Sequence, residues 1–217
     1  MVEHVHRRTQ AARRIDAVVV ATDDERIARV VDAFGGTAVM TSPDHATGTD
    51  RLAEVAVSMD CELVVNVQGD EPMMSPEAID AAVELLLDRP DELIGTLRRR
   101  IEDVRELYVP SIVKVVVDRD GYALYFTRAP IPFMLPGHEA PVLWRHLGLY
   151  VYRRTFLRTL ASLPQTPLER AEGLEQLRVL EHGFRIRTAE TTVETIGVDT
   201  PEDLERVRRL IEGGVRT

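Results

Sequence analysis

The sequence predicts an α/β fold in which a mixed, mainly parallel sheet carries helices on both faces, together with a smaller antiparallel lobe. Three observations favour this class. Apolar runs alternate with helical segments as far as Pro90, which is typical of strands joined by crossover helices. After Pro90, several apolar runs follow one another across short turns, as in antiparallel sheets. A chain of 217 residues with 44% hydrophobic content is long enough to bury a proper core.

The first half of the chain supplies the alternation of strand and helix. The expected strands are 17–21, 37–41 and 63–68, each an apolar run that ends at polar residues or glycine. The expected helices are 1–14, 25–34, 49–59 and one that begins at Pro76. Asp24 and Ser75 carry side chains that suit helix N-caps, and Gly35 ends the second helix.

The second half adds an antiparallel part and two further helical regions. The expected strands are 93–97, 112–117, 123–126, 146–152, 185–189 and 195–198. The expected helices are 155–163, 167–181 and one that begins at Pro201. The turn Asp118-Arg119-Asp120-Gly121 predicts a hairpin between two of the strands. Because no internal repeat or linker interrupts the chain, we expect one domain over 1–217.

Composition excludes several classes of protein. A net charge of −9 argues against a nucleic-acid surface, which needs a basic stripe. The only lysine is Lys114, so the chain has no Walker-type phosphate loop. The single Cys61 excludes an internal disulfide and fits a reducing compartment. No apolar run approaches the length of a membrane span, and residues 1–14 are too charged for a secretory signal. We therefore expect a cytoplasmic protein with no nucleic-acid or membrane partner.

Two expected strands end at an acidic residue, which suggests a metal site. Asp70 follows the 63–68 strand, and Asp199 follows the 195–198 strand. Ligands bind at the carboxyl ends of strands in open α/β sheets, so the two carboxylates could meet around one hard cation such as Mg²⁺. The alternative for Asp199 is a helix cap before Thr200 and Pro201.

A polar loop over 42–51 contains groups that could bind a base or ribose. It offers hydroxyls, a glycine that permits close approach and an arginine, including Thr47, Gly48, Thr49 and Arg51. Gln68, near the end of the 63–68 strand, lies next to the expected metal site. The alternative for the loop is a capped helix start, with Thr49 as the cap and Arg51 in solvent.

Other candidates lie in the second half of the chain. Arg128 stands before two prolines that stiffen the backbone, where it could clamp a carboxylate or phosphate. His146 and Tyr150 are four residues apart on a strand and therefore share one face. Glu172 and Glu175 are three residues apart on an expected helix. Structural roles for the histidine and tyrosine, and a solvated helix face for the glutamates, are the alternatives.

The amino-acid sequences of several segments resemble those of one enzyme family. The segments that carry the resemblance are 21–27, 40–42 with His45, 48–51, 66–72, 128–132, 145–150, 174–178 and 197–204, in this order. Together they closely resemble the bacterial 3-deoxy-manno-octulosonate (Kdo) cytidylyltransferases, also called CMP-Kdo synthetases. The resemblance covers essentially the whole chain. It implies a Rossmann-like nucleotidyltransferase fold, with a hairpin and sugar-binding lobe within 112–152.

The resemblance also implies a reaction and roles for residues. The family transfers CMP from CTP to Kdo, releasing pyrophosphate, for lipopolysaccharide biosynthesis, and is usually dimeric. Asp70 and Asp199 would hold Mg²⁺, and Arg128 would pair with the Kdo carboxylate. Cytidine would be bound by Gln68, Thr47, Gly48, Thr49 and Arg51. The Kdo hydroxyls would be bound by His146, Tyr150, Glu172 and Glu175.

The start of the chain departs from the family pattern. Family members begin with a strand and a basic loop that wraps the triphosphate, and this sequence starts after that segment. We therefore expect a gap between the strands that flank the absent one, and impaired turnover by the chain as written. Two alternatives are a related sugar-acid cytidylyltransferase, such as a CMP-sialate synthetase, and a non-catalytic remnant of the family that binds a ligand.

Overall fold

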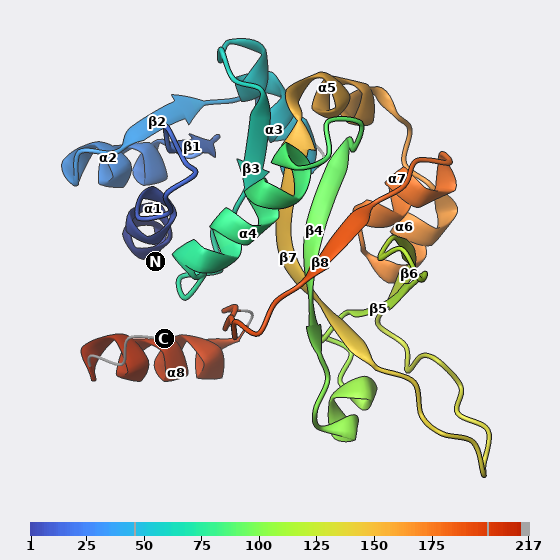
Figure 1. The fold of residues 1–217 in the computed structure, drawn as a ribbon. Coiled ribbons are helices and arrows are strands. Elements are labelled where there is room, and N and C mark those ends of the chain that lie inside the picture. Colours follow the sequence, from blue (N-terminus) through green and yellow to red (C-terminus); the bar gives the residue numbers. More distant parts are fainter. Residues whose placement is uncertain (46, 199, 214–217) are drawn as a thin grey trace.

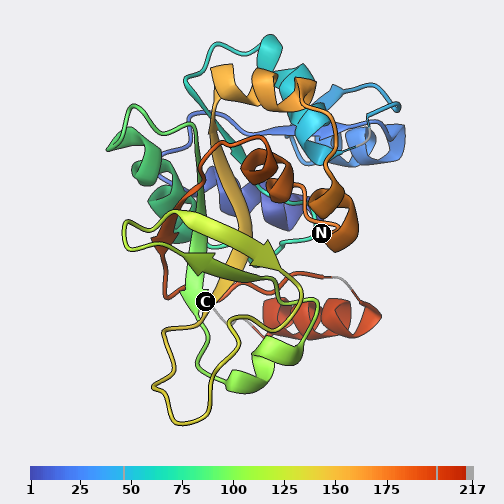
Figure 2. The same ribbon diagram turned by 90° about the vertical axis from the view of Figure 1, so that its right-hand side faces the viewer.

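A mixed sheet with helices on both faces forms the body of the protein (Figures 1 and 2). The computed structural model describes residues 1–45, 47–198 and 200–213. Within them, the main sheet contains β3 (Leu63–Asn66), β4 (Ile94–Arg100), β5 (Lys114–Val117), β6 (Ala123–Thr127), β7 (Trp144–Arg153) and β8 (Arg187–Glu190). The predicted α/β fold class is confirmed.

The long strand β7 organises this sheet. It pairs antiparallel with β4 along most of its length and with β3 near its end, and β4 pairs parallel with β8. Consequently β3, β4 and β8 run in one direction, and β7 runs between β3 and β4 in the other. The hairpin of β5 and β6 joins β7 near its start, and the turn at Gly121 adopts a positive φ of 84°. The predicted hairpin is therefore confirmed.

A second, two-stranded sheet lies beside the first. It consists of β1 (Val19–Thr22) and β2 (Thr37–Met40), which pair in parallel. Among the described residues β1 pairs only with β2, and β3 pairs only with β7. In the described part of the chain, β1 and β3 therefore belong to separate sheets.

Helices lie on both sides of the main sheet. The helices of the described ranges are α1 (Val2–Gln10), α2 (Glu25–Ala33), α3 (Gly48–Val57), α4 (Pro76–Leu87), α5 (Arg154–Ser162), α6 (Pro167–Glu172), α7 (Gln176–Glu181) and α8 (Pro201–Glu212). α4 lies against one face, while α5, α6 and α7 lie toward the other (Figure 1). The predicted cap of α4 is confirmed, because the Ser75 hydroxyl accepts hydrogen bonds from the amides of Glu77 and Ala78.

Alternation along β7 separates two apolar cores. Leu149 and Val151 pack with α4 on one face of the sheet. Tyr150 and Tyr152 belong to the core on the other face, together with residues of α3, α5 and α7. Because neighbouring side chains of a strand point to opposite faces, every second residue of β7 is directed toward the same face. The cavity described below opens on the face that carries Tyr150 and Tyr152.

Two predicted elements are wrong. Residues 195–198 do not form a strand, although the amide of Val198 donates to the carbonyl of Asp70 at 2.8 Å. The predicted helix 167–181 is broken into α6 and α7, because Gly173 adopts a left-handed conformation with φ of 62°. Glu172 and Glu175 therefore do not lie on one helix, and their spacing of three residues does not put them on a common helical face.

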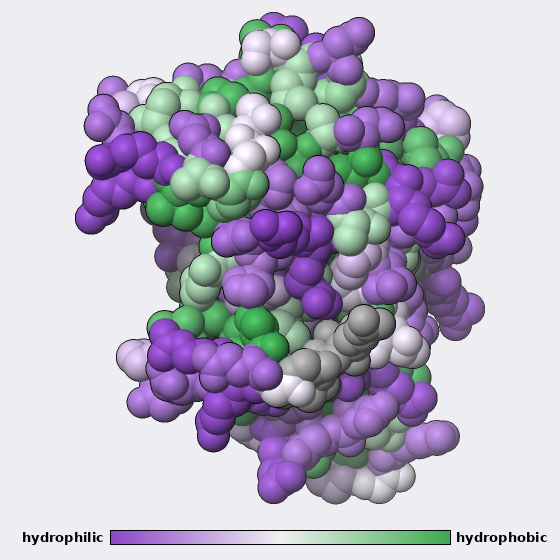
Figure 3. All heavy atoms as spheres, turned by 90° about the vertical axis from the view of Figure 1, so that its left-hand side faces the viewer, coloured by the Kyte–Doolittle hydropathy of each residue, from purple (hydrophilic) through white to green (hydrophobic). Residues whose placement is uncertain are grey.

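The surface is largely polar on the side that carries α1, α2 and α8. Figure 3 shows this side as hydrophilic with small apolar patches. At the opposite end of the sheet, β5, β6, the 3₁₀ helix η1 (Val104–Tyr108) and the loop before β7 form a projecting lobe (Figure 1). None of the helices in the described ranges has both the length and the apolar character needed to cross a bilayer.

Candidate active site

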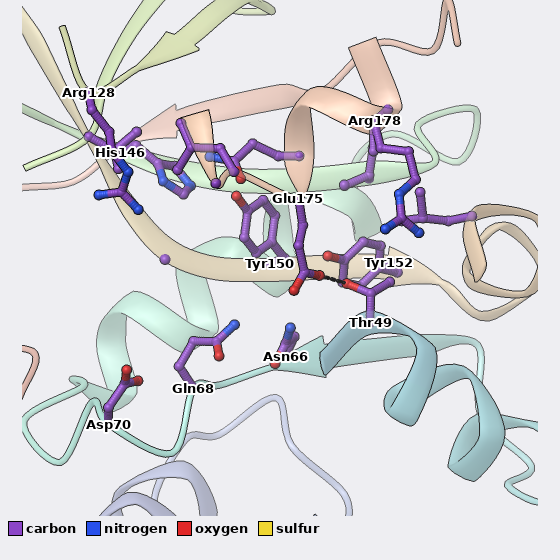
Figure 4. Close-up of a pocket in the computed structure, with 18 residues that line it drawn as sticks. Thr49, Asn66, Gln68, Asp70, Arg128, His146, Tyr150, Tyr152, Glu175 and Arg178 are labelled. Carbon is purple, nitrogen blue, oxygen red and sulfur yellow. Dashed lines mark hydrogen bonds between the residues drawn. The ribbon is translucent and has the colours of Figure 1, made fainter. Parts of the chain in front are cut away.

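A cavity of about 400 Å³ opens on the Tyr150 face of the sheet (Figure 4). Of the predicted site residues, those that line it are Thr49, Gln68, Asp70, Arg128, His146, Tyr150 and Glu175. Polar residues that line it without having been predicted are Asn66, Tyr152, Gln176 and Arg178. The cavity therefore brings together side chains from α3, β3, β7, the β6 end and the segment that joins α6 to α7.

The wall supplied by β7 consists of alternate residues, including His146, Tyr150 and Tyr152. The rings of His146 and Tyr150 are 5.2 Å apart, which confirms that these residues share a face. The Tyr150 side chain is only 7% exposed, and among the described residues its hydroxyl finds no hydrogen-bond partner. Burial, with the nearby Tyr152 and Glu175, raises the pKa of this hydroxyl well above its usual value. A neutral hydroxyl is thus left available to a ligand.

His146 is held neutral at the cavity wall. Burial lowers the pKa of its imidazole to about 3, and Nε2 lies 2.9 Å from the Thr96 hydroxyl. Because Nε2 is bonded to Thr96, Nδ1 is the ring nitrogen left to form a hydrogen bond with a hydroxyl group of a ligand.

The buried imidazole of His146 predicts a loss of stability in acid. Between pH 6.5 and about 3, the unfolded chain binds a proton on this histidine that the folded protein does not, so the free energy of unfolding falls as the pH is lowered. The expected slope is at most about 1.4 kcal/mol for each pH unit, since the ring borders an open cavity. Urea unfolding at pH 7 and pH 5 tests this. His146→Gln should lose less stability on acidification than the parent, whereas the exposed control His4→Gln should not differ from it.

The break at Gly173 brings Glu175 to the cavity. Glu175 stands at the N-cap position of α7, and its carboxylate accepts a hydrogen bond of 2.6 Å from the Thr49 hydroxyl on α3. Figure 4 shows this bond crossing from one wall of the cavity to the other. A continuous helix through Gly173 would not carry the chain along this path, so the glycine has a direct consequence for the site.

Arg128 enters the cavity from the end of β6. Its Nε donates to the carbonyl of Glu172 at 2.8 Å and its Nη1 to the carbonyl of Pro110 at 3.1 Å. Within the described part of the chain, Nη2 donates no hydrogen bond. A guanidinium fixed on one side and open on the other is suited to pairing with a carboxylate or phosphate.

Glu172 supports Arg128 and does not line the cavity. Its carboxylate accepts hydrogen bonds from the Thr127 hydroxyl at 2.6 Å and from the Arg128 amide at 2.9 Å. Burial acts to raise the pKa of this carboxyl, but the hydrogen bonds outweigh it and the pKa is lowered. The geometry of Glu172 is therefore that of a support for Arg128, and the expected contact with sugar hydroxyls stays a prediction.

Asp70 lies on the opposite side of the cavity from Arg128 in the view of Figure 4. It is exposed, and its carbonyl is tied to Val198, the residue before Asp199. Asp199 itself lies outside the described residues. No three His, Cys, Asp or Glu side chains in those residues are grouped so as to hold a metal ion. Mg²⁺ beside a nucleotide needs only one or two carboxylates together with phosphate oxygens, so the Asp70 carboxylate fits such a site.

The predicted nucleotide loop is divided between the cavity and a structural role. Thr47, not Thr49, caps α3, and its hydroxyl accepts a hydrogen bond from the Asp50 amide. Arg51 donates to Asp23 at 3.0 Å and to the Thr41 hydroxyl, so it links α3 to the ends of β1 and β2. Two residues along a helix are about 200° apart, which directs Thr49 and Arg51 to opposite sides. Since Thr47, Gly48 and Arg51 do not line the cavity, their part in cytidine binding stays a prediction.

The unpredicted residues have different origins. Tyr152 follows Tyr150 by two positions on β7, and Asn66 precedes Gln68 by two positions at the end of β3, so alternation could have identified both. Gln176 and Arg178 could not be found this way, because the break that starts α7 was not predicted. Arg178 is 3% exposed and forms a buried ion pair with Glu169, with Nε 2.8 Å from Oε2.

The protein is similar to known proteins in both sequence and fold. The model of the Cytidylyltransferase family matches residues 1–196, so the protein belongs to the class of cytidylyltransferases. The 3-deoxy-manno-octulosonate cytidylyltransferase of Solibacter usitatus is 52% identical over 215 residues, covering 99% of this chain and 85% of the relative. That of Syntrophotalea carbinolica is 54% identical, covering 98% and 88%. The chain belongs to the family of 3-deoxy-manno-octulosonate cytidylyltransferases.

A solved structure extends the likeness to three dimensions. CMP:2-keto-3-deoxy-manno-octonic acid synthetase complexed with CTP is 42% identical and superposes with a TM-score of 0.92. The match covers 99% of this chain and 88% of the other. A cytidylyltransferase from Leptospira borgpetersenii, at 13% identity and a TM-score of 0.63, shares the fold alone.

Proposed function

We propose that this protein transfers CMP from CTP to Kdo, giving CMP-Kdo and pyrophosphate for lipopolysaccharide biosynthesis. The relatives of more than 50% identity carry the name of this activity, and the similar structure is a complex with CTP. The observation that carries the proposal is the cavity, which collects one open guanidinium, several neutral or acidic hydrogen-bonding groups and the Asp70 carboxylate. A sugar acid and a nucleotide require these complementary groups.

The sugar acid is bound by the Arg128 half of the cavity. The free edge of the Arg128 guanidinium pairs with the Kdo carboxylate, and a bidentate contact would also orient the sugar. The Tyr150 hydroxyl and neutral His146 bind sugar hydroxyls, and the Glu175 carboxylate accepts from another. Cytidine is bound by Gln68 and Thr49, which line the cavity. The family resemblance adds Thr47, Gly48 and Arg51 to the cytidine site.

Transfer is one displacement at phosphorus. The anomeric oxygen of Kdo forms a bond to the α-phosphorus of CTP, the bond from that phosphorus to the bridging oxygen of pyrophosphate breaks, and the hydroxyl proton is released. Asp70 and Asp199 would hold Mg²⁺, which when bound neutralises phosphate charge. The chain's own residues mainly orient the two substrates, since this reaction needs no covalent intermediate on the protein.

We also propose a homodimer that acts in the cytoplasm. The projecting lobe exposes large apolar side chains, including Tyr108 at 68%, Phe133 at 85% and Leu135 at 59%. A second copy would remove this apolar surface from water. Sedimentation velocity is expected to give the mass of a dimer, and Phe133→Asp combined with Leu135→Asp to shift it toward the monomer. A monomeric parent protein at micromolar concentration would contradict the proposal.

The cytoplasmic location is supported by Cys61, since a single free cysteine is compatible with a reducing compartment.

Pyrophosphate release from CTP in the presence of Mg²⁺ tests the function. We expect release with Kdo, and CMP-Kdo as the product by mass spectrometry. A second reaction contains sialic acid in place of Kdo. A third uses a longer protein, in which this chain is preceded by the residues encoded immediately upstream. Preference for sialic acid would favour a related sugar-acid cytidylyltransferase. Binding of CTP and Kdo without pyrophosphate release by either form would favour a ligand-binding remnant.

A further inference from the structure

Lys114, the only lysine of the chain, is buried beside Arg128. Its side chain is 1% exposed at the start of β5. The Nζ donates to three main-chain carbonyls, those of Arg128 at 2.6 Å, Ile112 at 2.7 Å and Val109 at 3.1 Å. An ammonium group has three hydrogens, so these bonds use its whole donor capacity. Lys114 therefore has no donor left for a substrate, and its effect must be exerted through the groups that it holds.

The three carbonyls surround Arg128. One belongs to Arg128 itself, and the other two bracket Pro110, whose carbonyl accepts the Arg128 Nη1. Lys114 thus fixes the main chain of Arg128 and also the short loop that orients its guanidinium. Glu172 completes the arrangement, because it accepts from the Arg128 amide and from Nε.

Burying the charge of the Lys114 ammonium costs free energy, and a purely structural residue at this position would not need to bury a charge. Burial of the ammonium group and the adjacent Arg128 cation both lower the pKa of Lys114, while Glu172 opposes them. An apolar residue such as the neighbouring Val115 fills a buried strand position without burying a charge. The three carbonyls converge on a donor that only a long cationic side chain can supply from this position.

We propose that Lys114 is a positioning residue for substrate binding, which holds Arg128 in the orientation that receives the sugar-acid carboxylate. The inference rests on the proposed function, because it takes Arg128 as the carboxylate-binding group. It assigns to Lys114 no contact with either substrate. Loss of the Lys114 ammonium should therefore act selectively on the sugar acid and leave CTP binding unchanged.

Substitution of Lys114 tests whether its effect is confined to the sugar acid. Lys114→Met is expected to raise the KM for Kdo at least about tenfold and to leave the KM for CTP within about twofold. In an Arg128→Ala background the same change should have little further effect, since the group that it positions is gone. Val115→Ala is the matched control, because it removes buried methyl groups from the same strand and should lower stability without changing the KM for Kdo.

A measurement on the unmodified protein covers the case in which Lys114→Met fails to fold. Isotope labelling of lysine gives one side-chain NMR signal, because the chain contains one lysine. We expect this signal to shift when Kdo is added to the parent protein and to remain fixed in Arg128→Ala. A parent signal that does not respond to bound Kdo, or a folded Lys114→Met with an unchanged KM for Kdo, would overturn the proposal. An Arg128→Ala variant with normal Kdo binding would instead contradict the proposed function of Arg128.

Discussion

Replacement of Asp70 by asparagine is expected to lower the rate of CMP transfer by about 10²–10³-fold. The substitution keeps the size of the side chain and removes the charge with which Asp70 is proposed to hold a divalent cation. Because Mg²⁺ beside a nucleotide depends on one or two carboxylates, loss of one of them should also raise the Mg²⁺ concentration needed for half-maximal rate. Initial rates of pyrophosphate release over a Mg²⁺ titration measure both effects.

Asp60 provides the matched control for Asp70. It is exposed and precedes β3, whereas Asp70 follows the same strand. Asp60→Asn should leave the rate and the Mg²⁺ dependence within about twofold of the parent. An Asp70→Asn protein with the parent's Mg²⁺ dependence would show that Asp70 does not take part in metal binding.

Replacement of Arg128 by alanine should have the second large effect. We expect kcat/KM for Kdo to fall by about 10²–10³-fold, because a charge-assisted and bidentate contact with the carboxylate is lost. Arg128→Lys should recover only part of the loss, since a single ammonium cannot reproduce the planar pair of donors. Steady-state kinetics with each substrate varied in turn measure the effect and separate it from any change in the KM for CTP.

Arg170 serves as the control for this arginine. It lies on α6 close to Glu172 in sequence, donates to the carbonyl of Gln165 and does not line the cavity. Arg170→Ala is expected to leave kcat/KM for Kdo unchanged within about twofold. Equal losses for the two arginines would mean that general charge near the cavity, and not the fixed Arg128 guanidinium, determines Kdo recognition.

Local signals in the sequence predicted most of the fold. The cap at Ser75, the hairpin turn at Gly121 and the apolar run that forms β3 depend on interactions within a few residues, so a single sequence reveals them. The insertion of β7 between β3 and β4 could not be predicted this way, because it depends on pairing between residues 44 to 90 positions apart. The failure of 195–198 to form a strand has the same origin, since an apolar run forms a strand only where a partner is available.

The predicted site divides along similar lines. Residues on strands, such as His146 and Tyr150, line the cavity because strand geometry fixes their direction, and Asp70 reaches it from the turn that follows β3. The separation of Glu172 from Glu175 could not be predicted, because Gly173 ends α6 and helical periodicity alone does not show such a break. The partners of Arg51, Asp23 and Thr41, could not be predicted from the loop itself, because they directly follow β1 and β2.

Anomalous diffraction from crystals of the protein with Mn²⁺ and CTP would show whether Asp70 and Asp199 bind one metal ion. We expect one strong Mn²⁺ peak bonded to carboxylate oxygens of both Asp70 and Asp199, with the α-phosphate of CTP beside it. Coordination distances of about 2.0–2.2 Å are expected for such a site. A peak away from Asp70, or an Asp199 carboxylate that points to another part of the molecule, would contradict this expectation.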